Sequence, residues 1–171
     1  LKHFVSRGAF DIDGLGAKQI EMFFADPQLP VREPADIFTL AARDAANLTR
    51  LKNRDGFGER SATNLFQAIE DRRRISLHRL IFALGIRHVG EVASGLLARH
   101  YSTWEAFEAA ITHADPGSPG WQELNAIDGV GAVLAGSLVA AFQNAAERQA
   151  IDRLAAELVV QPVLARAPQD S

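Results

Sequence analysis

Pairs of glycines recur along this chain with one apolar residue between them. The clearest copies are Gly14-Leu15-Gly16, Gly56-Phe57-Gly58 and Gly129-Val130-Gly131, each followed by apolar residues at helical spacing. The first glycine can adopt a positive φ that ends a helix, and the second lets a ligand approach the backbone closely. Unpaired amides at such a turn and at the next helix start form a donor site for phosphate. The pattern therefore predicts phosphate binding by the main chain, without recognition of bases.

A fourth, degenerate copy is expected at Arg87-His88-Val89-Gly90, where His88 occupies the first-glycine position. Histidine adopts a positive φ less readily than glycine does. Gly85 and Ile86 precede this copy and would lengthen its turn. The chain is thus expected to contain four hairpins, near residues 14, 56, 88 and 129.

Side chains beside these turns can add charge to the backbone donors. Lys18 and Arg60 stand two residues after a second glycine and can reach a bound phosphate. Val92 and Val133 stand at the same position and cannot. We therefore expect the first two hairpins to supply most of the side-chain charge.

Other residue types give little sign of catalysis. The five histidines lack paired i, i+4 spacing and have no cysteine near them, which argues against a metal site. Asp13, Asp55 and Asp128 each precede a first glycine, which predicts turn stabilisation through Asx hydrogen bonds. Ser61 and Ser94 lie within one helical turn of their hairpins, and each hydroxyl could bind phosphate or cap its own helix.

Composition limits the classes of protein to consider. The chain has 171 residues, no cysteine and a net charge of −3. The charge argues against a protein that coats nucleic acid generally, but residues 1–85 carry +2 and residues 86–171 carry −5. No apolar run approaches the roughly 20 residues of a membrane span, and no signal peptide is recognisable. These features predict a reducing, cytoplasmic setting and no membrane partner.

Helical periodicity accounts for nearly all the apolar residues and no convincing strand is present, so the predicted class is all-α. Leu1 to Arg7 is expected to form a helical turn that continues something longer. Trp104 and Phe107 share one helix face and are expected in the core rather than in a base-stacking platform. Further helices are expected over residues 17–25, 34–38, 39–51, 61–74, 77–84, 92–101 and 131–158, the last with a break near 143–144.

The expected domain covers residues 1–160, with one pair of hairpins in about 1–75 and another in 76–160. Residues 161–171 are expected to form a linker or tail. The basic run Arg72-Arg73-Arg74 is expected to be a solvated helix end that complements its own helix dipole, with direct phosphate contact as the less favoured alternative.

The four units resemble helix-hairpin-helix motifs, two of which commonly pack as a pseudo-twofold pair across the minor groove of duplex DNA. His3-Phe4-Val5-Ser6-Arg7, residues 11–16 and above all Leu80-Ile81-Phe82-Ala83-Leu84-Gly85-Ile86-Arg87-His88-Val89-Gly90 closely resemble the bacterial NAD-dependent DNA ligases. The likeness runs from residue 1 to about 158 and includes His88 in the third hairpin. In that family this region lies between a four-cysteine zinc finger and a BRCT domain.

The resemblance implies a non-catalytic module that binds nicked duplex DNA in the minor groove and helps the ligase to encircle it in replication and repair. It implies no cofactor in this chain, because NAD, a divalent metal and the nucleotidyl lysine belong to other parts of the ligase. The implied partner domains are the nucleotidyltransferase, OB, zinc-finger and BRCT domains. The candidate DNA-binding residues are Gly14, Leu15, Gly16, Lys18, Gly56, Phe57, Gly58, Arg60, Ser61, Arg87, His88, Val89, Gly90, Ser94, Gly129, Val130 and Gly131.

Two other interpretations remain open. A DNA-repair glycosylase or lyase also uses the hairpin, but it would need a lysine or aspartate in a pocket beside a single hairpin. A helical protein-interaction module would use the glycine turns only for packing. Lys52-Asn53-Arg54-Asp55-Gly56 has one residue too many for the Lys-x-Asp-Gly signature of ligase nucleophiles, so we interpret it as part of the second hairpin.

Overall fold

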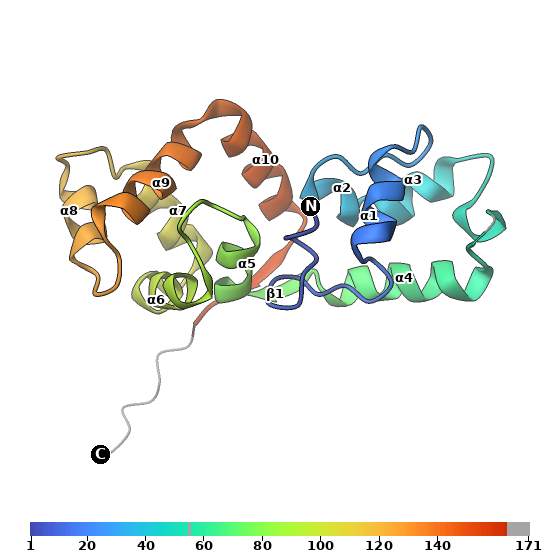
Figure 1. Cartoon of the computed structure of the whole chain (residues 1–171), viewed down its shortest axis with the longest axis horizontal. Helices are drawn as coiled ribbons and strands as arrows, with labels where there is room; N and C mark the ends of the chain where they lie inside the picture. The colour runs from blue at the N-terminus through green and yellow to red at the C-terminus, as the bar shows by residue number, and fades with distance from the viewer. Residues whose placement is uncertain (55, 164–171) are drawn as a thin grey trace, which may run out of the picture.

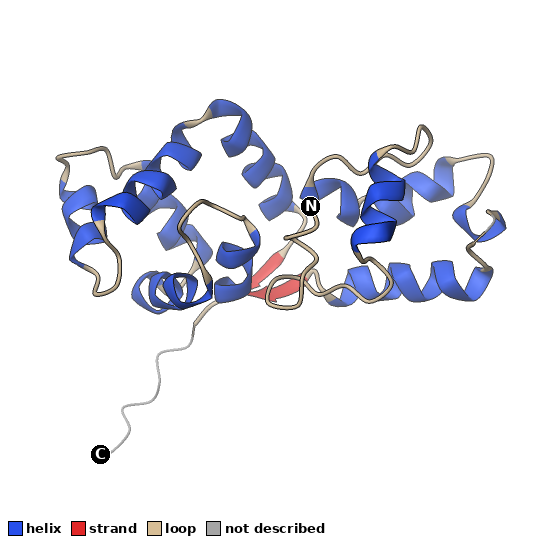
Figure 2. Ribbon diagram, in the orientation of Figure 1, coloured by secondary structure: helices blue, strands red, loops and turns tan. Residues whose placement is uncertain are grey.

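A computed structural model describes residues 1–54 and 56–163 of the chain. These residues are mostly helical, with one small two-stranded sheet (Figures 1 and 2). None of their helices is long and apolar enough to cross a membrane. The elements in order are α1 (Ala17–Phe24), α2 (Pro34–Phe38), α3 (Leu40–Ala46), the 3₁₀ helix η1 (Leu51–Asn53), α4 (Glu59–Asp71), β1 (Arg74–Ser76), α5 (Leu77–Ala83), α6 (Glu91–Tyr101), α7 (Trp104–Thr112), α8 (Pro119–Ala126), α9 (Ala132–Gln143), α10 (Ala145–Ala156) and β2 (Val159–Gln161).

The helices form two groups joined by the strands (Figure 1). Helices α1–α4 lie on one side and α5–α9 on the other, while α10 returns to the middle and packs on both α9 and α2. Phe4 stacks on Phe10 at 4.2 Å in the first group, and Trp104 lies 5.7 Å from Phe107 in the second. The prediction that Trp104 and Phe107 belong to the core is confirmed, because they are 6% and 0% exposed.

Most helix predictions are confirmed, including the break after residue 143. There the side chain of Asn144 caps α10 by accepting a hydrogen bond from the Glu147 amide at 3.0 Å. The prediction of one helix over 39–51 is wrong, because α3 ends at Ala46 and the chain re-forms only a 3₁₀ turn at η1. Residues 1–10 form successive turns without a regular α-helix. The predicted helical turn at the start is confirmed, because the Val5 amide donates to the Leu1 carbonyl at 3.2 Å.

Strands β1 and β2 were not predicted. They pair in parallel, with Ile75 opposite Val160 and Ser76 opposite Gln161. Gln161 therefore belongs to the folded domain rather than to a tail, and the Val163 amide donates to the Ser102 carbonyl at 2.8 Å. Residues 164–171, the rest of the predicted tail, lie outside the described residues.

The basic run after α4 joins the two groups of helices. Arg72 donates to the Asp11 carbonyl at 3.2 Å, while Arg73 donates to the carbonyl of Phe38 and to the Glu157 carboxylate at 2.9 Å. Phe38 is the last residue of α2, so Arg73 complements the dipole of that helix and not of its own. The prediction of a solvated run is therefore wrong for Arg72 and Arg73, which are held by protein acceptors.

Candidate nucleic-acid interface

Four turns in the described residues share one backbone geometry. We name them turn 1 (residues 12–16), turn 2 (54 and 56–58), turn 3 (86–90) and turn 4 (127–131). In each, the amide of the middle apolar residue donates to the carbonyl three residues earlier. The four bonds are Leu15 to Ile12 (3.1 Å), Phe57 to Arg54 (3.1 Å), Val89 to Ile86 (3.0 Å) and Val130 to Ile127 (3.0 Å).

The residue before the middle position always has a positive φ. The values are 84° for Gly14, 85° for Gly56, 72° for His88 and 90° for Gly129. His88 thus adopts the left-handed conformation that its alignment with the glycines predicts. Turn 3 therefore has the same backbone geometry as the other three turns. Gly85 ends α5 with a φ of 65°, which accounts for the extra residues before turn 3.

The middle residues anchor the turns. Leu15 is 1% exposed, Val89 and Val130 are buried, and the ring of Phe57 lies 6.1 Å from that of Phe23 in α1. Because their amides are already bonded, these residues have no main-chain donor left for an anion. Their predicted anchoring role is supported, whereas their place among the DNA-binding residues stays a prediction.

The residue after each anchor is the N-cap of a helix: Gly16 for α1, Gly58 for α4, Gly90 for α6 and Gly131 for α9. All four cap glycines are exposed. Within the described part of the chain, the amides of Gly58, Gly90 and Gly131 have no hydrogen-bond acceptor, whereas the Gly16 amide donates to the Gln19 side chain at 3.1 Å. Among the described residues, three caps therefore present a donor without an acceptor at a helix start, where the helix dipole also favours an anion.

The fold itself does not require glycine at these caps. Their φ values lie between −88° and −117°, which any residue adopts. A Cβ added at Gly58, Gly90 or Gly131 would meet nothing within 4 Å, whereas one added at Gly129 would lie 2.6 Å from Leu96 Cδ1. The first glycine of a turn is thus constrained by its positive φ, and at Gly129 also by the nearby Leu96 side chain, whereas the cap position has neither constraint.

The second residue of each following helix divides the turns into two kinds. Lys18 and Arg60 are exposed after turns 1 and 2, and neither forms an ion pair within the described residues. After turns 3 and 4, Val92 and Val133 are 78% and 68% exposed. Arg87 is exposed within turn 3.

The two candidate serines differ in accessibility. Ser61 is the third residue of α4 and is exposed, whereas Ser94 is the fourth residue of α6 and is 0% exposed, with a hydroxyl that has no partner among the described residues. One residue along a helix turns the side chain by about 100°, so Ser94 faces the core and its predicted phosphate contact is wrong. The predicted Asx bonds are also absent at Asp13 and Asp128 within the described residues, and Asp55 lies outside them.

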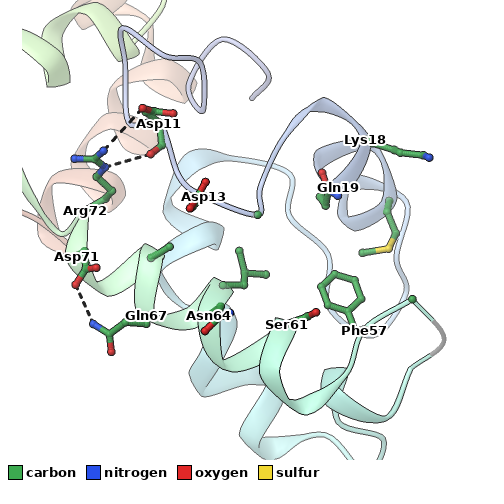
Figure 3. A pocket seen from close by; sticks show the side chains of 15 residues that line it. Asp11, Asp13, Lys18, Gln19, Phe57, Ser61, Asn64, Gln67, Asp71 and Arg72 are labelled. Atoms are coloured by element: carbon green, nitrogen blue, oxygen red, sulfur yellow. Dashed lines mark hydrogen bonds and ion pairs between the residues drawn. The ribbon is translucent and has the colours of Figure 1, made fainter.

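An open hollow of about 1380 Å³ lies between turns 1 and 2 (Figure 3). Gly14 and Gly56 line it together with Ser61 and Asn64 of α4. Lys18 extends outward beside it (Figure 3). Leu65 of α4 lies 3.8 Å from a Cβ built on Gly14, and α1 in turn supports Phe57 of turn 2 through Phe23. Each helix therefore supports the turn of the other, and both turns border the same hollow.

Comparison with known proteins shows which proteins this chain is similar to. A model of the helix-hairpin-helix motif matches residues 79–151. DNA ligases of Cereibacter sphaeroides, Roseobacter denitrificans and Agrobacterium fabrum are 62%, 61% and 55% identical over 98%, 95% and 98% of this chain. The chain is thus similar to one stretch of these DNA ligases. It spans about a quarter of the length of these relatives (24%, 23% and 24%).

The matched residues contain turns 3 and 4, which have α-helices on both sides: α5 and α6 around turn 3, and α8 and α9 around turn 4. Turn 1 instead follows the non-helical residues 1–10, and turn 2 follows the short η1. The described residues therefore contain two complete motifs, and two turns that keep the same hairpin geometry but lack the leading α-helix. Within the described residues, no cluster of three or more metal-ligating side chains occurs.

Proposed function

We propose that this chain binds duplex DNA at a nick, in the minor groove, as the helix-hairpin-helix module of an NAD-dependent DNA ligase. The observation that carries the proposal is the set of four exposed cap glycines. Three of them have open space where a Cβ would stand and an amide without an acceptor in the described part of the chain. Since nothing inside the fold requires glycine there, the requirement comes from a partner that approaches the backbone closely. A phosphate at a helix N-terminus makes such an approach.

The proposed contacts suit a chain with a net negative charge. Main-chain amides attract phosphate without adding formal charge, so a net charge of −3 does not exclude a polyanionic ligand. Lys18 and Arg60 add cations beside turns 1 and 2, where the amino-terminal half is more basic. Contacts of this type position the protein on the sugar-phosphate backbone and read no base sequence.

Turns 1 and 2 form one proposed pair and turns 3 and 4 the other, each pair spanning the two strands across the groove. The mutual support of α1 and α4 favours the first pair. In the second pair, turn 4 packs on α6 through Gly129 and Leu96. The shared strand pair and α10 would then hold the two pairs in one orientation along the duplex.

The parent protein would supply the chemistry. NAD, a divalent metal and the lysine that accepts AMP would belong to other domains of a cytoplasmic ligase acting in replication and repair. This module would keep the nicked duplex in place while those domains close around it. Its proposed partners are therefore the DNA and the nucleotidyltransferase, OB, zinc-finger and BRCT domains of the same protein.

Fluorescence anisotropy with the full 171-residue chain tests the proposal. We expect salt-sensitive binding to a labelled duplex, tighter for nicked than for intact duplex and weakest for single strands, regardless of base sequence. The variants Gly58→Ser and Gly131→Ser place a side chain in front of the free amide while keeping a good N-cap. Each should weaken duplex binding about tenfold, and Gly136→Ser, in open space within α9, is the matched control.

The competing interpretations predict other results. Cleavage of a duplex at an abasic site would indicate a lyase and contradict a non-catalytic module. Equal binding by the two cap variants and the wild type would show that the cap glycines do not approach DNA. Absence of any duplex binding would favour a protein-interaction module in which the turns serve packing alone.

A further inference from the structure

Two exposed valines lie where turns 3 and 4 would meet the duplex. We propose that Val92 and Val133 pack against the sugars of the bound strands and make this half of the chain selective for deoxyribose over ribose. The inference rests on the proposed function and adds to it the sugar chemistry of the preferred strands.

Both valines occupy the position of a contact residue. Each is the second residue of a helix that begins at a cap glycine with a free amide, α6 after Gly90 and α9 after Gly131. The equivalent residues of the other two turns are Lys18 and Arg60, whose long side chains can reach the phosphate itself. A valine is too short for the phosphate and has no charge to offer it, so it faces the sugar next to that phosphate.

Turn 4, which leads to Val133, packs against the helix that carries Val92. Leu96 lies one helical turn beyond Val92 on the same face of α6. Turn 4 rests on that face, because a Cβ on Gly129 would lie 2.6 Å from Leu96 Cδ1. Turn 4 leads directly through Gly131 into Val133, which is the second residue of α9.

The chemistry of this surface favours a sugar without a 2′-hydroxyl. Deoxyribose offers C–H groups to an isopropyl side chain, whereas ribose displays a 2′-hydroxyl in the minor groove. A hydroxyl covered by valine loses water and gains no hydrogen-bond partner. The described helix α9 contains no charged side chain and offers Val133 no polar neighbour in its first turn, where Ala132, Val133 and Leu134 follow one another.

The double variant Val92→Thr/Val133→Thr tests this inference. Threonine keeps the branched shape and adds a hydroxyl that can pair with a 2′-hydroxyl, and both sites are exposed enough to accept it without disturbing the core. Binding of the full chain is measured by anisotropy on a nicked DNA duplex and on a nicked duplex of the same sequence with one RNA strand. We expect the wild type to prefer DNA and the variant to lose about tenfold of that preference, with an unchanged salt slope.

Lys18→Ala is the matched control, because it should lower the salt slope and weaken both duplexes equally. Any preference that arises from the overall shape of a hybrid duplex is common to all variants and cancels in the comparison. A double threonine variant with the preference of the wild type would overturn the inference while leaving duplex binding established. A wild-type chain that binds neither duplex would instead contradict the proposed function itself.

Discussion

Neighbouring glycines of turn 4 should respond in opposite ways to the same substitution. Gly129→Ala should strongly destabilise the fold, whereas Gly131→Ala should hardly change the free energy of unfolding. Gly129 has a φ of 90°, and its Cβ would lie 2.6 Å from Leu96 Cδ1. Gly131 has a φ of −96°, and its Cβ would meet nothing within 4 Å.

The magnitudes follow from these geometries. An alanine in a left-handed conformation costs about 1–2 kcal/mol, and displacement of the Leu96 methyl costs about 1 kcal/mol more. Gly129→Ala should therefore cost about 2–3 kcal/mol. Alanine is a poorer N-cap than glycine by about 0.5 kcal/mol, which sets the expected effect of Gly131→Ala. For a chain of this size, 1 kcal/mol shifts the melting temperature by about 2–4 °C.

Differential scanning calorimetry measures both effects. The expected melting temperature falls by about 8 °C for Gly129→Ala and by 2 °C or less for Gly131→Ala. Gly56→Ala provides an intermediate case, because Gly56 has a φ of 85° but open space around its Cβ position. Equal destabilisation by Gly129→Ala and Gly131→Ala would refute the division between an internally constrained turn position and an open cap.

Three further outcomes are expected. Lys18→Ala and Arg60→Ala should each reduce the slope of log affinity against log salt by roughly one, measured by anisotropy, and an unchanged slope would exclude a phosphate contact. Arg73→Met should lower the free energy of unfolding, measured in urea, by about 2 kcal/mol, because the Phe38 carbonyl loses a charged donor. An unchanged urea midpoint of unfolding would show that Arg73 does not stabilise the junction between the two groups of helices. Burial, aided by the Glu123 carboxylate, raises the pKa of the Tyr101 phenol to about 12. The neutral phenol should therefore contribute about 2 kcal/mol to the free energy of unfolding. This contribution should be fully present below pH 10 and be lost as the pH rises through 12, and the Tyr101→Phe variant should not show this loss of stability. Absorbance at the phenolate band follows this titration directly, since Tyr101 is the one tyrosine in the sequence.

The sequence was most informative where one residue type has a distinct backbone preference. The first glycines predicted positive φ values, and the recurrence of the pattern was strong enough to assign one to His88 as well. The anchors were predictable because an apolar residue between two glycines has no local reason to be exposed. The helix break near residues 143–144 was predictable because an asparagine side chain there can cap the helix that follows.

The sequence was least informative where distant segments meet. Each strand is three residues long, which is too short to show alternation, and Ile75 pairs with Val160 across most of the second half of the chain. Arg73 belongs to a basic run that suggests solvent, and only the tertiary fold brings the end of α2 to it. The accessibility of Ser94 depends on the rotation of α6 about its axis, which a motif alone does not specify.

The contrast between locally determined backbone and variable side chains explains how one repeat can carry either a cation or a valine at the same position. The backbone of each turn is determined locally, by a left-handed residue, a buried anchor and a cap glycine, so all four turns keep the same geometry. The second helical residue is exposed in every copy and contributes nothing to the turn, so it is free to vary with the role of each half. If our proposals hold, the cations there make binding by turns 1 and 2 depend on salt, and the valines make binding by turns 3 and 4 depend on the sugar. The two halves should then respond separately when salt and sugar are varied independently.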